Sequence, residues 1–205
     1  MNMAHIIKEA SVKLYEIAES QQGYFTTKQA KKAGYAENTH PYHVRAVNWI
    51  REHRGIYRLK LFPVSNEGQY VLYSLWSQNR DAEVQGIYSH ETALVLHNLS
   101  DLMPSKLHIS VPKSFRRNSK IPKVLVLHFQ NIPSDDIEQK HGFLVTKPFR
   151  ALLDVIRENS VSPEFQKQAL MQAIELGLVS RAEIKKTKLS LEDRVAIEHL
   201  LKEVA

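Results

Sequence analysis

Side chains that can form hydrogen bonds with DNA are concentrated between residues 28 and 58. Histidine, tyrosine and threonine can bond base edges or phosphates, and an arginine can do either with two hydrogen bonds at once. The candidate readers of base sequence lie on an expected third helix and are Thr39, Tyr42, His43 and Arg45. Further DNA contacts are predicted from Lys28, Lys32, His40, Arg51, Arg54 and Arg58. For Tyr42 and His43 the alternative is packing against the first helix.

The rest of the sequence holds no strong catalytic or metal-binding pattern. Asp136, Glu138 and Lys140 resemble the metal-binding end of a nuclease site, but such a site takes its carboxylates from two neighbouring strands. His90 and His97 lie seven residues apart on one helical face, yet two histidines without a third ligand pack more often than they bind zinc. We therefore expect no catalytic residue, no metal site and no cofactor, and an enzyme is the third of three functional hypotheses.

Hydrophobic periodicity predicts the helices that position the candidate readers. A first helix is indicated by apolar residues that repeat at the 3.6-residue period, namely Ile6, Ile7, Ala10, Leu14, Ile17 and Ala18. A second helix is expected to begin at Thr27, as its cap, and to end at Gly34. Pro41 suits the first turn of the third helix, which is expected to run to about Val47 with Val44 and Val47 facing the core.

A hairpin is expected to follow the third helix, through pairing of residues 48–52 with 56–61. Three helices and then a hairpin are the layout of a winged helix-turn-helix, so residues 1–75 are predicted to be a DNA-binding domain. A turn-rich segment, 62–68, then leads to an apolar run at 70–76. That run is expected to form a helix that packs the hairpin onto a second domain.

The distribution of charge agrees with this placement. Residues 1–61 hold ten lysines and arginines against five glutamates, so this segment carries +5 of the chain's net charge of +6. A concentrated positive field favours phosphate binding, and each neutralised phosphate adds affinity that depends on salt. The alternative is an ordinary solvated basic surface.

Residues 82–205 are expected to form a mixed α+β domain. Runs of β-branched residues at 107–111, 123–129 and 142–145 predict strands. Helices are expected at about 89–99, 148–158, 163–176, 180–187 and 190–203, so the C-terminal third is helical. The predicted fold class is therefore α+β, with an N-terminal winged helix-turn-helix followed by this domain.

Composition limits the remaining possibilities. The chain has no cysteine, so it can form neither a disulfide nor a thiolate zinc site. No apolar run reaches the roughly 18 residues that a membrane span needs, and residues 1–5 do not resemble a secretory signal. We expect a cytoplasmic protein without membrane contact.

Several segments resemble the AbiEi family of type IV antitoxins. In the first domain they are residues 24–30, 42–45 and 54–59, and in the second they are 89–94, 97–101, 107–112, 145–150 and 173–179. Together they cover most of the chain in the order expected for that family. Val47 is a departure, because a glycine is expected there.

The resemblance implies a repressor of its own operon that counteracts a nucleotidyltransferase toxin, and its operator would be double-stranded DNA with inverted repeats. A partner surface is then expected around His90 and Glu91 or around Arg116 and Arg117, which lie in a basic run between two predicted strands. For that run the alternatives are a solvated loop or an extra contact with DNA. The alternative function is a regulator without a toxin, whose second domain dimerises or senses a ligand. The sequence leaves open whether the protein is a monomer or a dimer.

Overall fold

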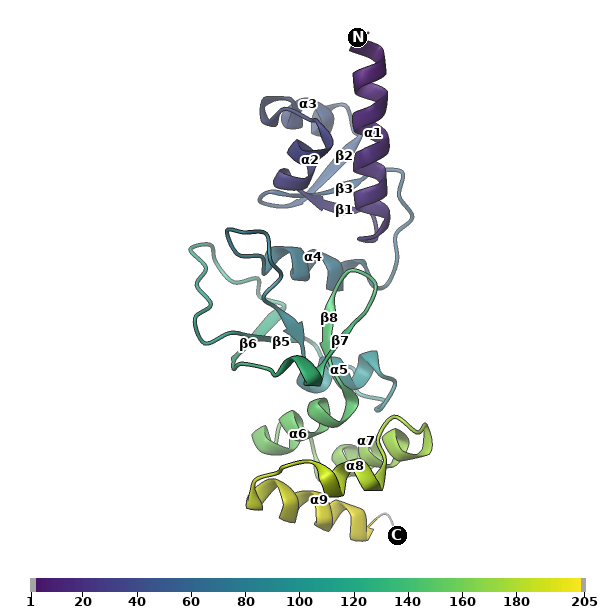
Figure 1. Cartoon of the computed structure of the whole chain (residues 1–205), viewed down its shortest axis with the longest axis vertical. Coiled ribbons are helices and arrows are strands. Elements are labelled where there is room, and N and C mark those ends of the chain that lie inside the picture. Colours follow the sequence, from purple (N-terminus) through teal and green to yellow (C-terminus); the bar gives the residue numbers. More distant parts are fainter. Residues whose placement is uncertain (1–2, 204–205) are drawn as a thin grey trace. The chain divides into compact units, whose positions relative to one another are not determined.

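The chain divides into two compact units in the computed structural model, which describes residues 3–203, with side chains from 8 to 202. The first unit is Met1–Gly86 with Gln139–Phe143, and the second is Ile87–Glu138 with Leu144–Ala205 (Figure 1). The first unit thus continues past the expected boundary at residues 75–82 and includes a short later segment. Helices and two separate sheets occur together, so the α+β class is confirmed.

The first unit is built from helices and one small antiparallel sheet. Its strands follow the order β1-β3-β2. The elements are α1 (Met3–Glu19), β1 (Tyr24–Thr26), α2 (Thr27–Ala33), the 3-10 turn η1 (Glu37–Thr39), α3 (His40–Arg45), β2 (Trp49–His53), β3 (Ile56–Leu59) and α4 (Gly68–Trp76). The three N-terminal helices and the β2–β3 hairpin lie where they were expected, and β1 was not foreseen.

The core of the first unit forms where the apolar face of α1 meets α2 and the sheet. Leu14 and Ala18 are buried there with Phe25, Ala30 and Trp49. The rings of Phe25 and Trp49 meet edge to face with centroids 4.9 Å apart, a favoured aromatic geometry. The predicted stripe on α1 is confirmed from Ala10 onward, and the side chains of Ile6 and Ile7 lie outside the described residues.

Helix α2 begins one residue earlier than expected. Thr26, not Thr27, is its N-cap, and the Thr26 hydroxyl and the Gln29 side chain form a reciprocal capping box. Gly34 ends the helix with φ of +114°, as the sequence predicts.

Helix α3 ends earlier than predicted, and this corrects the placement of Val47. The helix stops at Arg45, and Val44 packs against the core. Val47 has φ of +57° and is 58% exposed, so it does not face the core. The left-handed backbone at this position is unfavourable for a β-branched residue and is the conformation that glycine adopts most easily.

Helix α4 belongs to the first unit, where it packs against β1 and β3. The segment 139–143 also belongs to this unit, and the Phe143 ring lies 5.3 Å from that of Tyr70 on α4.

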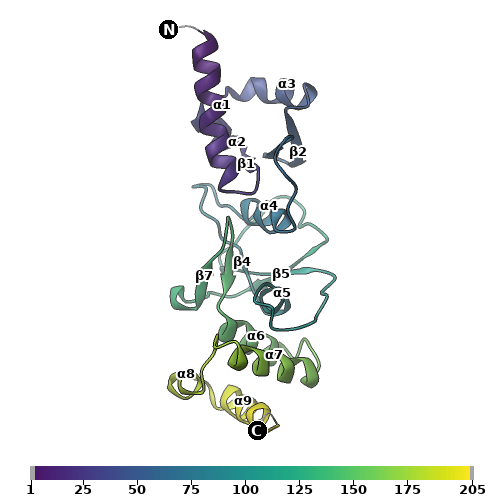
Figure 2. The ribbon, with the colours of Figure 1, turned by 90° about the vertical axis from the view of Figure 1, so that its right-hand side faces the viewer.

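The second unit combines a five-stranded mixed sheet with helices, and Figure 2 shows β4, β5 and β7 with α5 to α9. The strand order of the sheet is β6-β5-β4-β8-β7. Its strands are β4 (Ile87–Tyr88), β5 (Leu107–Val111), β6 (Leu125–Phe129), β7 (Ile137–Gln139) and β8 (Leu144–Thr146). Its helices are α5 (His90–Leu96), the 3-10 turn η2 (Ser134–Asp136), α6 (Pro148–Glu158), α7 (Pro163–Glu175), α8 (Arg181–Lys186) and α9 (Leu191–Glu203). The expected helical C-terminal third is confirmed, because α6 to α9 follow the last strand. Among the described helices, none is long and apolar enough to cross a membrane.

Candidate functional site

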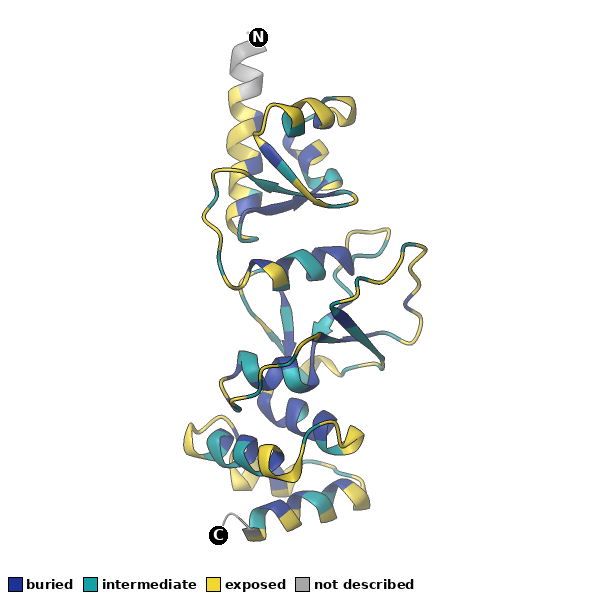
Figure 3. Cartoon of the chain, turned by 180° about the vertical axis from the view of Figure 1, so that it is seen from behind, coloured by how far each residue is buried: buried dark blue, intermediate teal, exposed yellow. Residues whose placement is uncertain are grey.

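The first unit exposes several cations that no carboxylate neutralises. Figure 3 shows exposed stretches on the helices of the first unit. Lys32 on α2, Arg45 at the end of α3, and Arg51 and Arg54 on the hairpin are exposed, and none of the four forms an ion pair with the side chains described for residues 8–202. Lys28 is exposed too, and its ammonium group bonds the carbonyl of Arg80. Such uncompensated charges create the positive potential that phosphates require.

The tip of the β2–β3 hairpin is fixed to the start of α2. Gly55, at the tip, has φ of +75°, and its carbonyl accepts a hydrogen bond of 2.9 Å from the Thr27 amide. The neighbouring Arg54 is thereby held beside the N-terminal turn of α2. The sequence places Arg54 on a hairpin tip, and the tertiary contact gives that tip a definite position.

Of the four predicted readers on or before α3, two are well exposed. Tyr42 is 61% exposed and Arg45 is also on the surface. Thr39 is half-buried, and its hydroxyl donates a 2.6 Å hydrogen bond to the Ala36 carbonyl, so its proton is already committed. Tyr42 and Arg45 therefore remain the side chains of this helix with the most freedom to meet a ligand.

His43 packs against the aromatic ring of Trp49 on β2. Packing against the first helix is the alternative to DNA contact that the sequence suggests. The His43 imidazole stacks on Trp49 with centroids 4.6 Å apart and planes inclined by 21°. Burial lowers the pKa of His43, and the neighbouring His40 lowers it further. The lowered pKa favours the uncharged ring at neutral pH, and this partly buried ring could form a hydrogen bond.

His40 is a correction to the predicted set of DNA contacts. Its side chain is 2% exposed and lies against the rings of Trp49 and Tyr57, with centroids 5.2 and 5.9 Å away. Neither ring nitrogen has a hydrogen-bond partner. As the first residue of α3 it packs against Trp49 on β2. The sequence does not reveal this, because a histidine beside a proline in a polar turn is expected to be exposed.

Arg58, which is also predicted to contact DNA, lies in an ion pair. Its guanidinium Nε bonds a Glu52 carboxylate oxygen at 2.9 Å across the hairpin, and the side chain is only 13% exposed. This charge is compensated within the protein, so Arg58 is a poorer phosphate ligand than Arg54 on the same hairpin.

The residues predicted to form a partner surface on the second unit differ in exposure: two arginines lie on the surface, and His90 and Glu91 are largely buried. Arg116 and Arg117 are exposed in the loop after β5, where Arg116 donates hydrogen bonds to the carbonyls of Lys113 and Phe115. The side chain of His90 is 1% exposed and that of Glu91 is 15% exposed, so His90 is buried and Glu91 is mostly covered. His90 therefore does not lie on an open partner surface, and partner binding by Glu91 stays a prediction.

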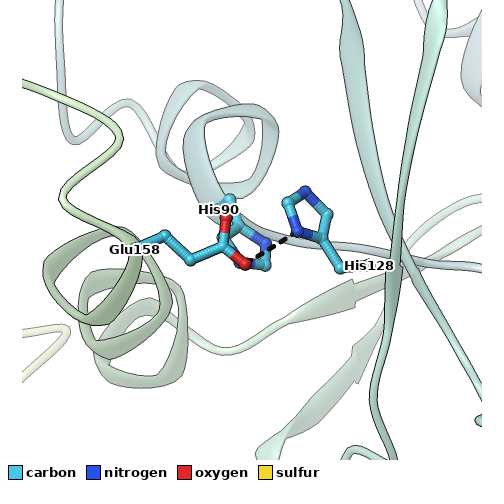
Figure 4. Close-up of side chains that lie close together, drawn as sticks. All are labelled: His90, His128 and Glu158. Carbon is cyan, nitrogen blue, oxygen red and sulfur yellow. Dashed lines mark hydrogen bonds and ion pairs between the residues drawn. The ribbon is translucent and has the colours of Figure 1, made fainter.

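A histidine cluster occupies the position of that expected surface (Figure 4). Glu158 Oε1 lies 3.2 Å from His90 Nε2 and 3.0 Å from His128 Nδ1. His128 Nε2 lies 3.1 Å from His108 Nδ1, and His108 Nε2 lies 3.0 Å from Glu91 Oε2. We call these five residues the histidine cluster: His90 and Glu91 on α5, His108 on β5, His128 on β6 and Glu158 on α6.

Burial favours the neutral form of two imidazoles of the histidine cluster, those of His90 and His108. Burial lowers the pKa of His90 to about 3, with smaller contributions from the neighbouring histidines. Burial also lowers the pKa of His108, and Glu91 opposes that shift. Both rings are thus available as uncharged nitrogen ligands at neutral pH.

His90 and His97, which lie seven residues apart in the sequence, have different partners in the structure. His97 Nε2 lies 2.8 Å from the carbonyl oxygen of Thr146, while His90 meets partners 38 and 68 residues further along the chain. No spacing rule connects residues on α5, β6 and α6, so sequence reasoning missed His128 and Glu158. The only sequence signal that could have identified His128 as a candidate is the presence of several histidines near predicted strands.

No protein-family model matches the chain, and no curated protein sequence matches it. Among solved structures, the fold is similar to the crystal structure of the RV2827C protein from Mycobacterium tuberculosis. The two share 12% sequence identity with a TM-score of 0.61, over 95% of this chain and 76% of the other. At this identity the likeness concerns the fold alone.

Proposed function

We propose that the chain is a DNA-binding transcriptional repressor whose first unit acts as a winged helix-turn-helix. The observation that carries the proposal is the set of exposed, uncompensated cations at Lys32, Arg45, Arg51 and Arg54. They lie on the helix before the turn, on the helix after it and on the hairpin. Those are the elements that such a module presents to the groove and to the flanking backbone.

The roles within this surface follow from exposure. Tyr42 and Arg45 on α3 are the base-reading candidates, and Arg51 and Arg54 contact phosphates or the minor groove from the hairpin. His40 and Arg58 no longer belong to the contact set, since the first is buried and the second is paired. His43 assists as a neutral hydrogen-bonding group at the edge of α3.

The test is binding of the full chain to a duplex from upstream of its own gene and to a scrambled duplex, measured by fluorescence anisotropy over a salt series. We expect preference for the upstream duplex and a steep decrease of affinity with salt, with a slope that reports the number of neutralised phosphates. A complex indifferent to both sequence and salt would contradict the proposal.

We propose further that the repressor is the antitoxin of a type IV, AbiE-like pair and counteracts a nucleotidyltransferase toxin. Its support is the resemblance in the segments of both domains. The experiment is growth of cells that express the nucleotidyltransferase encoded beside this gene, with and without the full chain. We expect the chain to restore growth, and Arg45→Ala with Arg54→Ala to abolish repression while growth is still restored. If growth fails in every case while repression persists, the chain is a regulator without a toxin.

The second candidate is a regulator whose second unit senses a ligand. The specific observation in its favour is the histidine cluster, which gathers three imidazoles and two carboxylates where a structural core needs none. Repression that responds to a small molecule or ion, in cells without a neighbouring toxin gene, would distinguish this candidate from an antitoxin.

A further inference from the structure

We propose that His90, His128 and Glu158 form a binding site for one divalent transition-metal ion of the zinc class. Two imidazoles and one carboxylate are a ligand set for such ions, and a water molecule completes a tetrahedral shell. Within residues 3–203 this is the one group of three metal-ligating side chains whose donor atoms all lie within 4.8 Å of one another.

Two of the three donor separations are close to those around a shared metal. Zinc–ligand bonds of about 2.0 to 2.2 Å at tetrahedral angles place neighbouring donor atoms about 3.3 to 3.6 Å apart. Glu158 Oε1 lies 3.2 Å from His90 Nε2 and 3.0 Å from His128 Nδ1, and all three donor atoms lie within 4.8 Å of one another. Binding of an ion therefore requires a small outward movement of the carboxylate, whose side chain is 47% exposed, together with a rotation of one histidine ring.

One carboxylate oxygen faces both proposed histidine ligands. Glu158 Oε1 is the atom nearest to His90 Nε2 and to His128 Nδ1 in these two ion-pair contacts. On its other side, His128 is linked through His108 to Glu91. A metal ion between Glu158 Oε1 and the two ring nitrogens would bond all three atoms at once.

The two histidine ligands also have the hydrogen-bond partners that ligating histidines usually have. A ligating histidine usually donates its second ring N–H to a neighbouring group, which fixes its orientation. His90 Nδ1 lies 2.8 Å from the hydroxyl of the fully buried Ser89, and that hydroxyl accepts a hydrogen bond from Ser110. His128 Nε2 has the His108–Glu91 pair in the same role.

One rearrangement accompanies binding. The rings of His90 and His128 are stacked, with centroids 3.6 Å apart and planes inclined by 16°, so one ion cannot lie in the plane of both. Rotation of one imidazole about its outer side-chain bond corrects this, and that torsion has a broad, shallow energy profile. His128 is the ring that turns, because it lies on the edge strand β6 and is 10% exposed, against 1% for His90.

The experiment uses the full chain without a histidine tag, stripped with a chelator and titrated with Zn²⁺ by calorimetry, with Co²⁺ absorption as a report of coordination. We expect one ion per chain, micromolar or tighter, and a cobalt spectrum typical of four ligands. Glu158→Gln and His128→Gln should each weaken binding at least about 10-fold, and Glu91→Gln should weaken it about 10-fold through orientation of His128. His199→Gln, which removes an exposed histidine of the same unit, is the matched control and should bind as the unaltered chain does.

Glu158→Gln keeps the test informative even if histidine substitutions disturb folding, because its side chain is half exposed. Thermal unfolding of each metal-free variant checks that the fold is intact. The proposal is overturned if the unaltered chain binds no Zn²⁺ at micromolar concentration, or if Glu158→Gln and His128→Gln bind it as tightly as the control. In either case His90, His128 and Glu158 do not form a metal-binding site.

Discussion

Basic side chains are arranged differently in the two units. On the first unit Arg45, Arg51 and Arg54 are exposed without an acidic partner among the described residues. In the second unit Arg150 and Arg157 are held by carboxylates that are themselves buried, Asp154 and Asp193. These three arginines of the first unit are thus open to solvent, whereas these two of the second unit are part of its internal structure, and the difference is the presence of a buried carboxylate partner.

Arg150 has three polar partners among the described residues of the second unit. Its guanidinium bonds Asp154 at 3.0 Å, Asp136 at 3.3 Å and Gln130 at 2.9 Å, so one side chain joins α6, η2 and the segment after β6. Burial raises the pKa of Asp154, while Arg150 opposes that shift. Without the arginine a buried carboxylate would lack its counter-charge.

The largest effect is expected from Arg150→Met, which removes that counter-charge and keeps the aliphatic stem. Breaking a buried ion pair on one side costs about 3 to 5 kcal/mol of the free energy of unfolding. Urea denaturation of the full chain measures it. Adding Asp154→Leu should recover most of the loss, and a double variant no more stable than the single one would contradict the explanation.

The sign of the pH dependence sharpens this prediction. In Arg150→Met the pKa of Asp154 in the folded state lies further above its unfolded value, so the penalty is present where the unfolded carboxyl is ionised. It should therefore shrink as the pH falls through the acid range. A deficit that stays constant from neutral to acid pH would show that lost packing, and not charge, is responsible.

The next largest effect is expected on DNA affinity, by comparing two arginines of one hairpin. Arg54→Gln should weaken binding, with a loss of about 1 to 3 kcal/mol if a base contact is removed and a salt slope shallower by about one unit if a phosphate contact is removed. Arg58→Gln is the matched control, because Glu52 already compensates that charge. Fluorescence anisotropy at several salt concentrations measures the DNA affinity of both variants. Equal effects of the two substitutions would show that pairing with Glu52 makes no difference to DNA binding.

A smaller effect is expected at the Arg157–Asp193 pair, where two hydrogen bonds of 3.0 and 2.9 Å join α6 to α9. Arg157 lowers the pKa of Asp193 to about 2. Because that folded-state pKa is depressed, the stabilisation is present above about pH 4 and is lost as the pH falls toward 2. Arg157 is 41% exposed, so solvent screening reduces the contribution to about 1 to 2 kcal/mol.

Asp193→Asn measures that contribution. The variant should be less stable than the unaltered chain at pH 7, and the two should converge near pH 2. A difference in stability that does not depend on pH would show that the pair acts through packing of α9 and not through charge.

The smallest effect is expected in the first unit, from Val47→Gly. The left-handed backbone at Val47 is strained for valine and not for glycine, so the substitution should stabilise the chain by up to about 1 kcal/mol. Val44→Gly is the contrasting variant, since Val44 lies within α3 and packs on the core, and it should destabilise. Thermal unfolding of the full chain separates the two.

Local features of the fold followed from the sequence. The apolar spacing of Leu14 and Ala18 predicted the buried face of α1, and Gly34 marked the end of α2. These succeed because helix periodicity and terminal conformations depend on residues within one or two turns. Boundaries were less certain, as the Thr26 cap and the end of α3 at Arg45 show, since neighbouring residues compete for the same terminal role.

The candidate sites depended on distant contacts. The exposure of Arg45 and Arg54 matched the prediction, whereas His40 and Arg58 were assigned to the surface and lie inside or in an ion pair. Polar residue types do not reveal whether a sheet from elsewhere in the chain will cover them.

The sequence by itself determined the order of the helices, the hairpin after the third helix, the basic character of the first 61 residues and the absence of cysteine chemistry. These are properties of composition and of short-range pattern. Only the tertiary structure decided which basic side chains form an ion pair within the chain and which residues contact His90. The donor atoms of His90, His128 and Glu158 converge because a helix start, an edge strand and a helix end pack together, and that packing depends on the whole core and not on any local spacing.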